Sequence, residues 1–223
     1  LLSPNAAFDI TPYCRFVEKE LEAWGFPVRV DPKTKRSTAT DVQSAFLKGD
    51  TRAPLLTIEA PQDVVGRTHR NRVLKIKLEI DTNPPAGIRS ETRFLLRPIP
   101  FPARICTMET LFAGKVHALL FRNWKNRTKG RDWYDLVWFA ARDIPVELNH
   151  LKARMVQTGD WSQEETLSEG QFRYLLSQCV QSLDIEAVRS DIEPFVKDPE
   201  EISVWSRAFF EQITGQLKVT SSG

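Results

Sequence analysis

One eight-residue segment, Leu74–Asp81, constrains the fold more than any other part of this sequence, because apolar and charged residues alternate along it without exception. The apolar positions are Leu74, Ile76, Leu78 and Ile80, and the charged positions are Lys75, Lys77, Glu79 and Asp81. Successive side chains of a β-strand point to opposite faces, so the pattern predicts a strand with one aliphatic and one charged face. The chain must therefore contain a sheet that packs one face against a core.

The periodicity of the remaining sequence changes near residue 105. Before it, the pattern predicts a helix over Thr11–Trp24, strands at Val28–Val30 and Glu91–Leu96, and an extended connector over residues 98–102. The segments Val42–Leu47 and Pro54–Glu59 are predicted as strands, with a helix as the alternative for each. After it, helices are predicted over Met108–Trp124, Arg131–Arg142, Pro145–Gln157, Gly170–Leu183, Ile185–Val196 and Val204–Leu217. A sheet followed by a run of helices is an α+β arrangement, with a mixed domain over residues 1–105 and an all-helical domain over residues 106–223.

Composition excludes several classes of protein. With 223 residues, 41 % hydrophobic and 27 % charged, the chain is long and apolar enough to bury a core. Three cysteines and three histidines are scattered, which disfavours a disulfide framework or a zinc site and favours a reducing compartment. No apolar run reaches the roughly 18–20 residues that span a bilayer, so we expect no membrane partner and a cytoplasmic location. A net charge of +2 decides nothing about nucleic acid.

The charged face of the Leu74–Asp81 strand has two interpretations. It is either a solvent face on which lysines and carboxylates neighbour each other, or a site in which Glu79 or Asp81 offers an oxygen ligand to a hard cation such as Mg²⁺. In the second case Lys75 and Lys77 would lie beside the cation and bind phosphate. The alternation alone leaves both open.

A basic segment follows, from Lys115 to Arg131. Its 17 residues contain no carboxylate and include Trp124. Its cations are Lys115, Arg122, Lys125, Arg127, Lys129 and Arg131. Such a segment either binds phosphate or nucleic acid, or is a solvated helix end where the helix dipole favours cations.

Two aspartates begin the next predicted helix, which is apolar on most sides and is therefore predicted to be buried. Asp135 would then need a cationic partner, either Arg131 one turn earlier or Lys115 on the preceding helix, and a structural ion pair is its expected role. Asp132, in the first turn, is a candidate for function. We expect His117 to be packed or exposed rather than catalytic.

Three blocks, in this order, resemble the AbiEii/AbiGii toxin family of nucleotidyltransferases: Leu74–Pro85, Leu111–Leu120 and Lys129–Leu136. The resemblance covers nearly the whole chain. It implies a polymerase-β-like nucleotidyltransferase fold, of which residues 1–105 form the remaining mixed sheet with flanking helices, followed by a helical region. The family includes toxins of toxin–antitoxin and phage-defence (abortive infection) systems, and some members add nucleotides to RNA such as tRNA.

The resemblance also implies roles for single residues. Glu79 would bind Mg²⁺, Lys77 and Lys115 would bind the phosphates of an NTP, and Asp132 would be needed for activity. Arg131 would orient Asp132 or the triphosphate. The residues expected to support this site are Asp81, Asp135 and His117.

The sequence departs from the family pattern at its start, because the glycine-serine/threonine and Asp-x-Asp motifs do not occur. We expect the chain to begin just after them, so that a full-length parent transfers a nucleotidyl group to RNA or protein while the isolated chain is inactive. One alternative is a non-catalytic module that binds RNA or an antitoxin through residues 115–131. Another is a structural domain in which Asp135 and Arg131 only connect helices.

Overall fold

The computed structural model describes residues 2–3, 7–9, 11–25, 28–31, 55–58, 74–77, 80–81, 83–122 and 129–221. The chain divides into two compact units, Leu1–Pro84 and Pro85–Gly223. Helices and small sheets occur together, which confirms the α+β class. The division lies earlier than the boundary predicted at residue 105, because the strands on either side of residue 100 belong to the second unit. The compact units do not test the change from a mixed to a helical domain, so the domain boundary at residue 105 stays a prediction.

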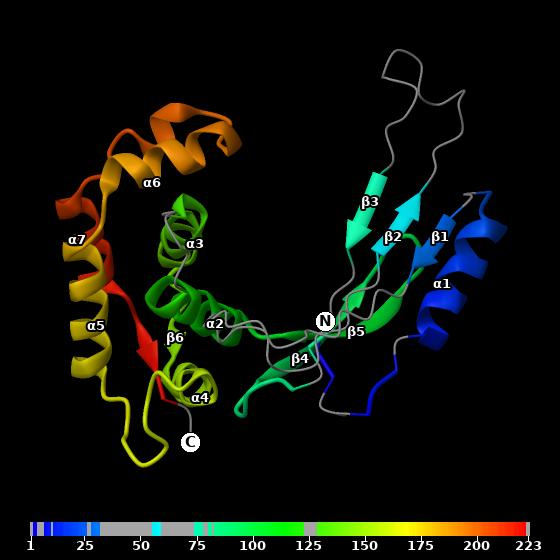
Figure 1. The fold of residues 1–223 in the computed structure, drawn as a ribbon, viewed down its shortest axis with the longest axis horizontal. Helices are drawn as coiled ribbons and strands as arrows, with labels where there is room; N and C mark the ends of the chain where they lie inside the picture. Colours follow the sequence, from blue (N-terminus) through cyan, green and yellow to red (C-terminus); the bar gives the residue numbers. More distant parts are fainter. Residues whose placement is uncertain are drawn as a thin grey trace, which may run out of the picture. The chain divides into compact units, whose positions relative to one another are not determined.

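The described residues of the first unit form one helix and one sheet (Figure 1). Helix α1 (Thr11–Ala23) precedes strands β1 (Val28–Asp31), β2 (Leu55–Ile58) and β3 (Leu74–Lys77), which form an antiparallel sheet in the order β1-β2-β3. Strand β2 confirms a strand within Pro54–Glu59. The segment Val42–Leu47 lies outside the described residues.

The alternating segment of the sequence is only partly described. Strand β3 covers its first four residues, Ile80 is buried beside Cys14 of α1, and Asp81 pairs with Leu2 in a parallel bridge. Val17 and Leu21 pack against the Cys14–Ile80 cluster. The periodicity that predicted α1 also included Phe16 and Trp24, but these side chains are exposed, so the buried stripe of α1 is narrower than the sequence pattern.

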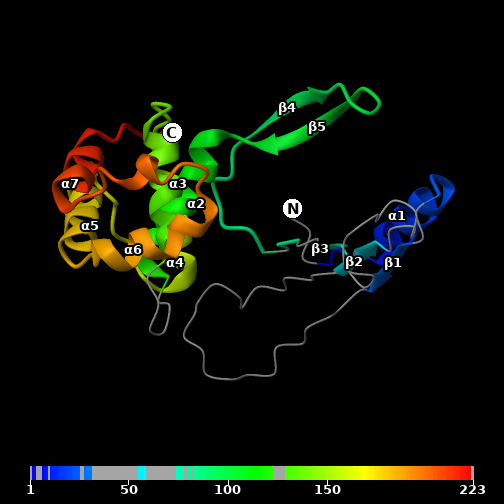
Figure 2. The ribbon, with the colours of Figure 1, turned by 90° about the horizontal axis from the view of Figure 1, so that it is seen from above.

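The second unit begins with a β-hairpin, which Figure 2 shows projecting from the helices of this unit. Strands β4 (Ser90–Leu95) and β5 (Phe101–Cys106) pair antiparallel from Ser90 opposite Cys106 to Leu95 opposite Phe101. The predicted connector over residues 98–102 is wrong at its end, because β5 begins at Phe101. Proline at position 102 hides this strand from sequence reasoning, although a strand at a sheet edge tolerates a missing N–H.

In the described part of the chain six α-helices follow, and they carry the main core. They are α2 (Met108–Phe121), α3 (Gly130–Ala140), α4 (Leu148–Thr158), α5 (Glu169–Gln181), α6 (Ile185–Ile192) and α7 (Arg207–Gln216), with 3₁₀ turns at Glu193–Phe195 and Pro199–Ile202. Its largest fully buried side chains include Phe112, Phe172, Phe210, Leu136, Leu151 and Met155. Within the described part of the chain, no helix has the length and apolar character needed to cross a membrane.

The sequence predicted an all-helical region after residue 105. The structure differs, because this region also contains two short strands. Strands β6 (Val146–Glu147) and β7 (Val219–Thr220) pair in parallel. Helix α4 therefore begins at Leu148 and not at Pro145. The carboxylate of Glu147 accepts hydrogen bonds from the backbone N–H groups of Asn149 and His150, which caps the new helix start.

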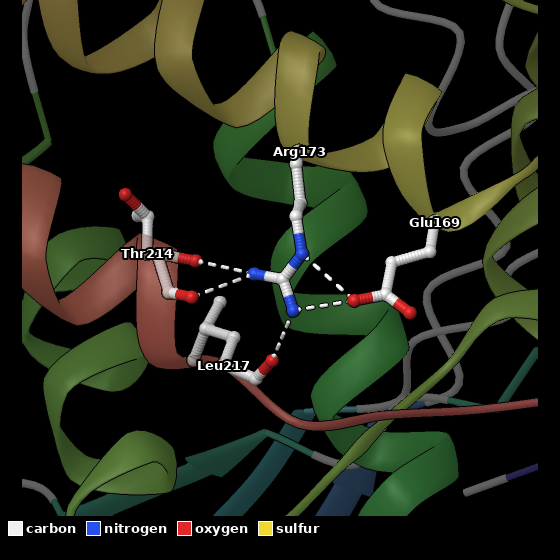
Figure 3. A network of polar contacts seen from close by, with 5 residues as sticks. Glu169, Arg173, Thr214 and Leu217 are labelled. Atoms are coloured by element: carbon white, nitrogen blue, oxygen red, sulfur yellow. Dashed lines mark hydrogen bonds and ion pairs between the residues drawn. The ribbon is translucent and has the colours of Figure 1, made fainter.

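Arg173 joins α5 to the end of α7 (Figure 3). Its guanidinium donates to the backbone carbonyls of Thr214 at 3.2 Å, Gly215 at 2.9 Å and Leu217 at 3.0 Å, and it pairs with Glu169 at 2.6 Å. The last carbonyls of a helix have no partner within the helix and carry partial negative charge. One side chain therefore satisfies the end of α7 and fixes it to α5.

Substitution Arg173→Met should lower the free energy of unfolding by about 2–3 kcal/mol, because three helix-end carbonyls lose a charged donor. Urea unfolding followed by circular dichroism measures this change. The matched control is Arg189→Met, whose partner Glu186 is 83 % exposed, and it should cost no more than about 0.5 kcal/mol. Equal losses in the two variants would show that Arg173 does not connect α5 and α7.

Candidate functional site

Helices α2 and α3 lie side by side and run antiparallel, because later residues of α2 contact earlier residues of α3. The rings of Phe112 and Phe139 stack at 4.6 Å with an interplanar angle of 2°. One turn further along α2, Lys115 Nζ lies 2.8 Å from Asp135 Oδ2. The side chains of Lys115 and Asp135 are 42 % and 23 % exposed, so the ion pair lies where the helix pair meets solvent.

The structure decides between the two partners predicted for Asp135. Lys115 makes the ion pair, whereas Arg131 is exposed. The prediction that the whole helix is buried is wrong on this face. Its buried stripe consists of Gly130, Trp133, Leu136 and Phe139, while Asp132 and Asp135 are only half-buried.

Asp132 lies in the first turn of α3, where charges of the basic segment act on it. Burial raises the pKa of its carboxyl group, and the charges of Arg122 and Lys129 oppose that rise. The charge of Asp135 raises the pKa more weakly, and that of Lys115 lowers it more weakly still. Arg122 follows the last residue of α2 and Lys129 precedes the first residue of α3, so charge beside both helix termini acts on Asp132. The site is therefore a half-buried carboxylate on which the charges of three cations act.

Such an arrangement suits a phosphorylated ligand. Cations from two helices, together with the positive end of the α3 dipole, attract phosphate oxygens. A carboxylate near such cations is the kind of group that can take a proton from a hydroxyl group of a bound ligand. These residues thus combine one half-buried carboxylate, Asp132, with the charges of Lys115, Arg122 and Lys129.

Helix α6 places the start of α3, and sequence reasoning missed this contact. Gly130 N donates to Asp191 Oδ2 at 3.0 Å, across 61 residues of sequence. A Cβ atom at Gly130 would lie 2.2 Å from the carbonyl oxygen of Val188. In the sequence, the signal for this close approach is Gly130 itself, because a residue without a Cβ atom lets two backbones come together.

His117 lies on α2 but faces the core. It is 1 % exposed, and its Nε2 lies 3.0 Å from Thr158 Oγ1 and 3.6 Å from Asp160 Oδ2. Burial, followed by the charge of Arg154, lowers its pKa to about 4. The imidazole is therefore neutral at physiological pH and packs as part of the helix interface.

The predicted metal site lies largely outside the described residues. Glu79 is not among them, and only the backbone of Lys77 is described. The carboxylate of Asp81 accepts a hydrogen bond from Asn83 N at 3.0 Å, as in an Asx turn. Across the described residues, no group of three or more His, Cys, Asp and Glu side chains could hold a metal ion. The roles of Glu79, Lys77 and Asp81 stay predictions.

Substitution Asp132→Asn should reduce the pH dependence of stability. Because the folded pKa of Asp132 is raised above its ordinary value of 3.8, the folded state binds more protons than the unfolded state between those two values. The contribution of Asp132 to the free energy of unfolding therefore falls as pH rises through that window, and asparagine carries no such cost.

Urea unfolding of both proteins at a series of pH values isolates this contribution as the difference between them. The variant should gain stability relative to the wild type as pH rises above 3.8. A difference that is constant with pH would contradict the burial of an ionised Asp132.

Comparison with known proteins identifies one family. Residues 13–214 match the family model described as nucleotidyl transferase AbiEii toxin, Type IV TA system. The match covers all three sequence blocks quoted above and both helices of the candidate site. No curated protein and no solved structure matches the chain.

Proposed function

We propose, from the premise that the chain belongs to the nucleotidyl transferase AbiEii toxin family, that its helical unit binds the triphosphate in a nucleotidyl transfer to RNA or protein. The family is one of nucleotidyltransferase toxins of type IV toxin–antitoxin systems. The nucleotide donor is an NTP, the reaction takes place in the cytoplasm, and a cognate antitoxin opposes its effect.

The observation that carries this proposal is the position of Asp132 beside the Lys115–Asp135 ion pair. Lys115, Arg122 and Lys129 neutralise the negative charge of the triphosphate, and the exposed Arg131 adds to it. Asp135 holds the ammonium group of Lys115 at the edge of the core. In this position the ammonium group is not buried and can contact a ligand.

The reaction then proceeds by displacement at phosphorus. A hydroxyl oxygen of the acceptor attacks the α-phosphorus, a new P–O bond forms, and the bond to pyrophosphate breaks. The hydroxyl proton passes to Asp132, and pyrophosphate leaves with the charge that the cations neutralise. Positioning and charge stabilisation therefore account for most of the protein's contribution.

Magnesium is the proposed cofactor, Glu79 is the proposed carboxylate for it, and Lys77 is a proposed phosphate-binding residue. When bound, Mg²⁺ would polarise the phosphoryl oxygens and the attacking hydroxyl. The described residues do not assemble a complete ligand set, so no step is assigned to the ion. The Asp-x-Asp motif does not occur in these 223 residues, and transfer is expected only where the two opening motifs of the family are also present.

The test is transfer of label from α-labelled nucleotides to total RNA and total protein, with and without EDTA. It uses the product of the complete reading frame that encodes these residues. Substitution Asp132→Ala should reduce transfer by about 100-fold, the scale on which loss of a general base acts. The matched control, Glu186→Ala, removes an 83 % exposed carboxylate and should leave transfer unchanged.

Two results would contradict the proposal. Transfer that persists in Asp132→Ala would remove Asp132 from the site. Absence of transfer in the wild type, together with RNA binding that weakens steeply with salt, would favour the non-catalytic module that binds through residues 115–131.

A further inference from the structure

Helix α3 is capped differently from the other α-helices of the second unit. The first N–H groups of a helix need acceptors, which the residue before the helix usually supplies. Side chains of Thr107, Glu147, Ser168, Asp184 and Ser206 cap α2, α4, α5, α6 and α7 in this way. Lys129, which precedes α3, makes no such bond, and Asp191 of α6 accepts from Gly130 N instead.

The same contact also brings two backbones together. A Cβ atom at Gly130 would lie 2.2 Å from Val188 O and 3.0 Å from both N and Cβ of Ile192. Gly130, Val188 and Ile192 are all buried. The absent side chain fixes how closely α3 approaches α6, and the hydrogen bond to Asp191 fixes how its first turn is oriented.

Asp132 belongs to that first turn, two residues after Gly130. We propose that Asp191 is a positioning residue, whose carboxylate caps α3 from α6 and thereby holds Asp132 in its half-buried place in the first turn of α3. This inference rests on the proposed function for its catalytic consequence. It assigns a role to α6, a helix that carries none of the residues named above for the charged site.

Two substitutions separate the cap from the charge. Asp191→Ala and Asp191→Asn both remove the negative charge, but only asparagine can still accept a hydrogen bond from Gly130 N. Asp184→Ala is the matched control, because Asp184 caps α6 itself through Ala187 N at 3.0 Å and its loss weakens the same helix. All three variants are made in the product of the complete reading frame.

The label-transfer assay should show a fall in kcat of about tenfold in Asp191→Ala, with little change in KM for the nucleotide, since misplacing a catalytic group affects the chemical step. Asp191→Asn should restore kcat to near the wild-type value, and Asp184→Ala should not lower it. A fall in kcat that follows thermal stability in all three variants would overturn the inference, because it would show a structural role only.

A second measurement does not depend on activity. The pKa of the Asp132 carboxyl group, followed by NMR titration, should move toward its ordinary value in Asp191→Ala, because a loosened first turn lets water reach it. It should stay raised in Asp191→Asn and in Asp184→Ala. Identical values in all proteins would overturn the positioning role. Wild-type protein without transfer would refute the proposed function, and the NMR comparison would still decide the role of Asp191.

Discussion

The antiparallel contact between α2 and α3 is the constraint on which the site depends. It brings together residues that are 20 positions apart in sequence, Lys115 and Asp135. A half-exposed ion pair contributes at most about 1 kcal/mol, so it does not hold the helices together. The stacked, buried rings of Phe112 and Phe139 do so through the apolar area they remove from water. The ion pair is therefore better understood as orienting Lys115 than as stabilising the fold.

The remaining helices act as a scaffold for this pair. Helix α6 receives the start of α3 at Gly130, and Arg173 of α5 closes the end of α7. Trp133 of α3 packs edge-on against Phe210 of α7 at 4.8 Å, which links the site helix to the same core. A charged site on two helices thus needs several further helices that contribute packing but no reacting group.

Sequence reasoning succeeded where a regular period or a contiguous block carried the signal. The helices of the second unit and the family membership belong to this class, whereas the sequence left helix and strand open for the segment that forms β2. It missed β5 because of Pro102, and it missed β6 and β7 because two-residue strands show no period. The contact between Gly130 and Asp191 spans 61 residues, and no local pattern predicts such a bond. The place of Glu79 stays a prediction, because Glu79 lies outside the described residues.

The most direct test of the central claim is equilibrium binding of a non-hydrolysable NTP, in the presence of Mg²⁺, to the product of the complete reading frame and two variants. Lys115→Met should raise Kd by about tenfold, the effect of losing one charge-assisted contact with phosphate. Arg142→Met should leave Kd unchanged, because Arg142 follows the far end of α3 and lies over the ring of Trp138 at 3.8 Å. Equal Kd values for Lys115→Met and the wild type would show that the charged site on α2 and α3 does not bind the nucleotide.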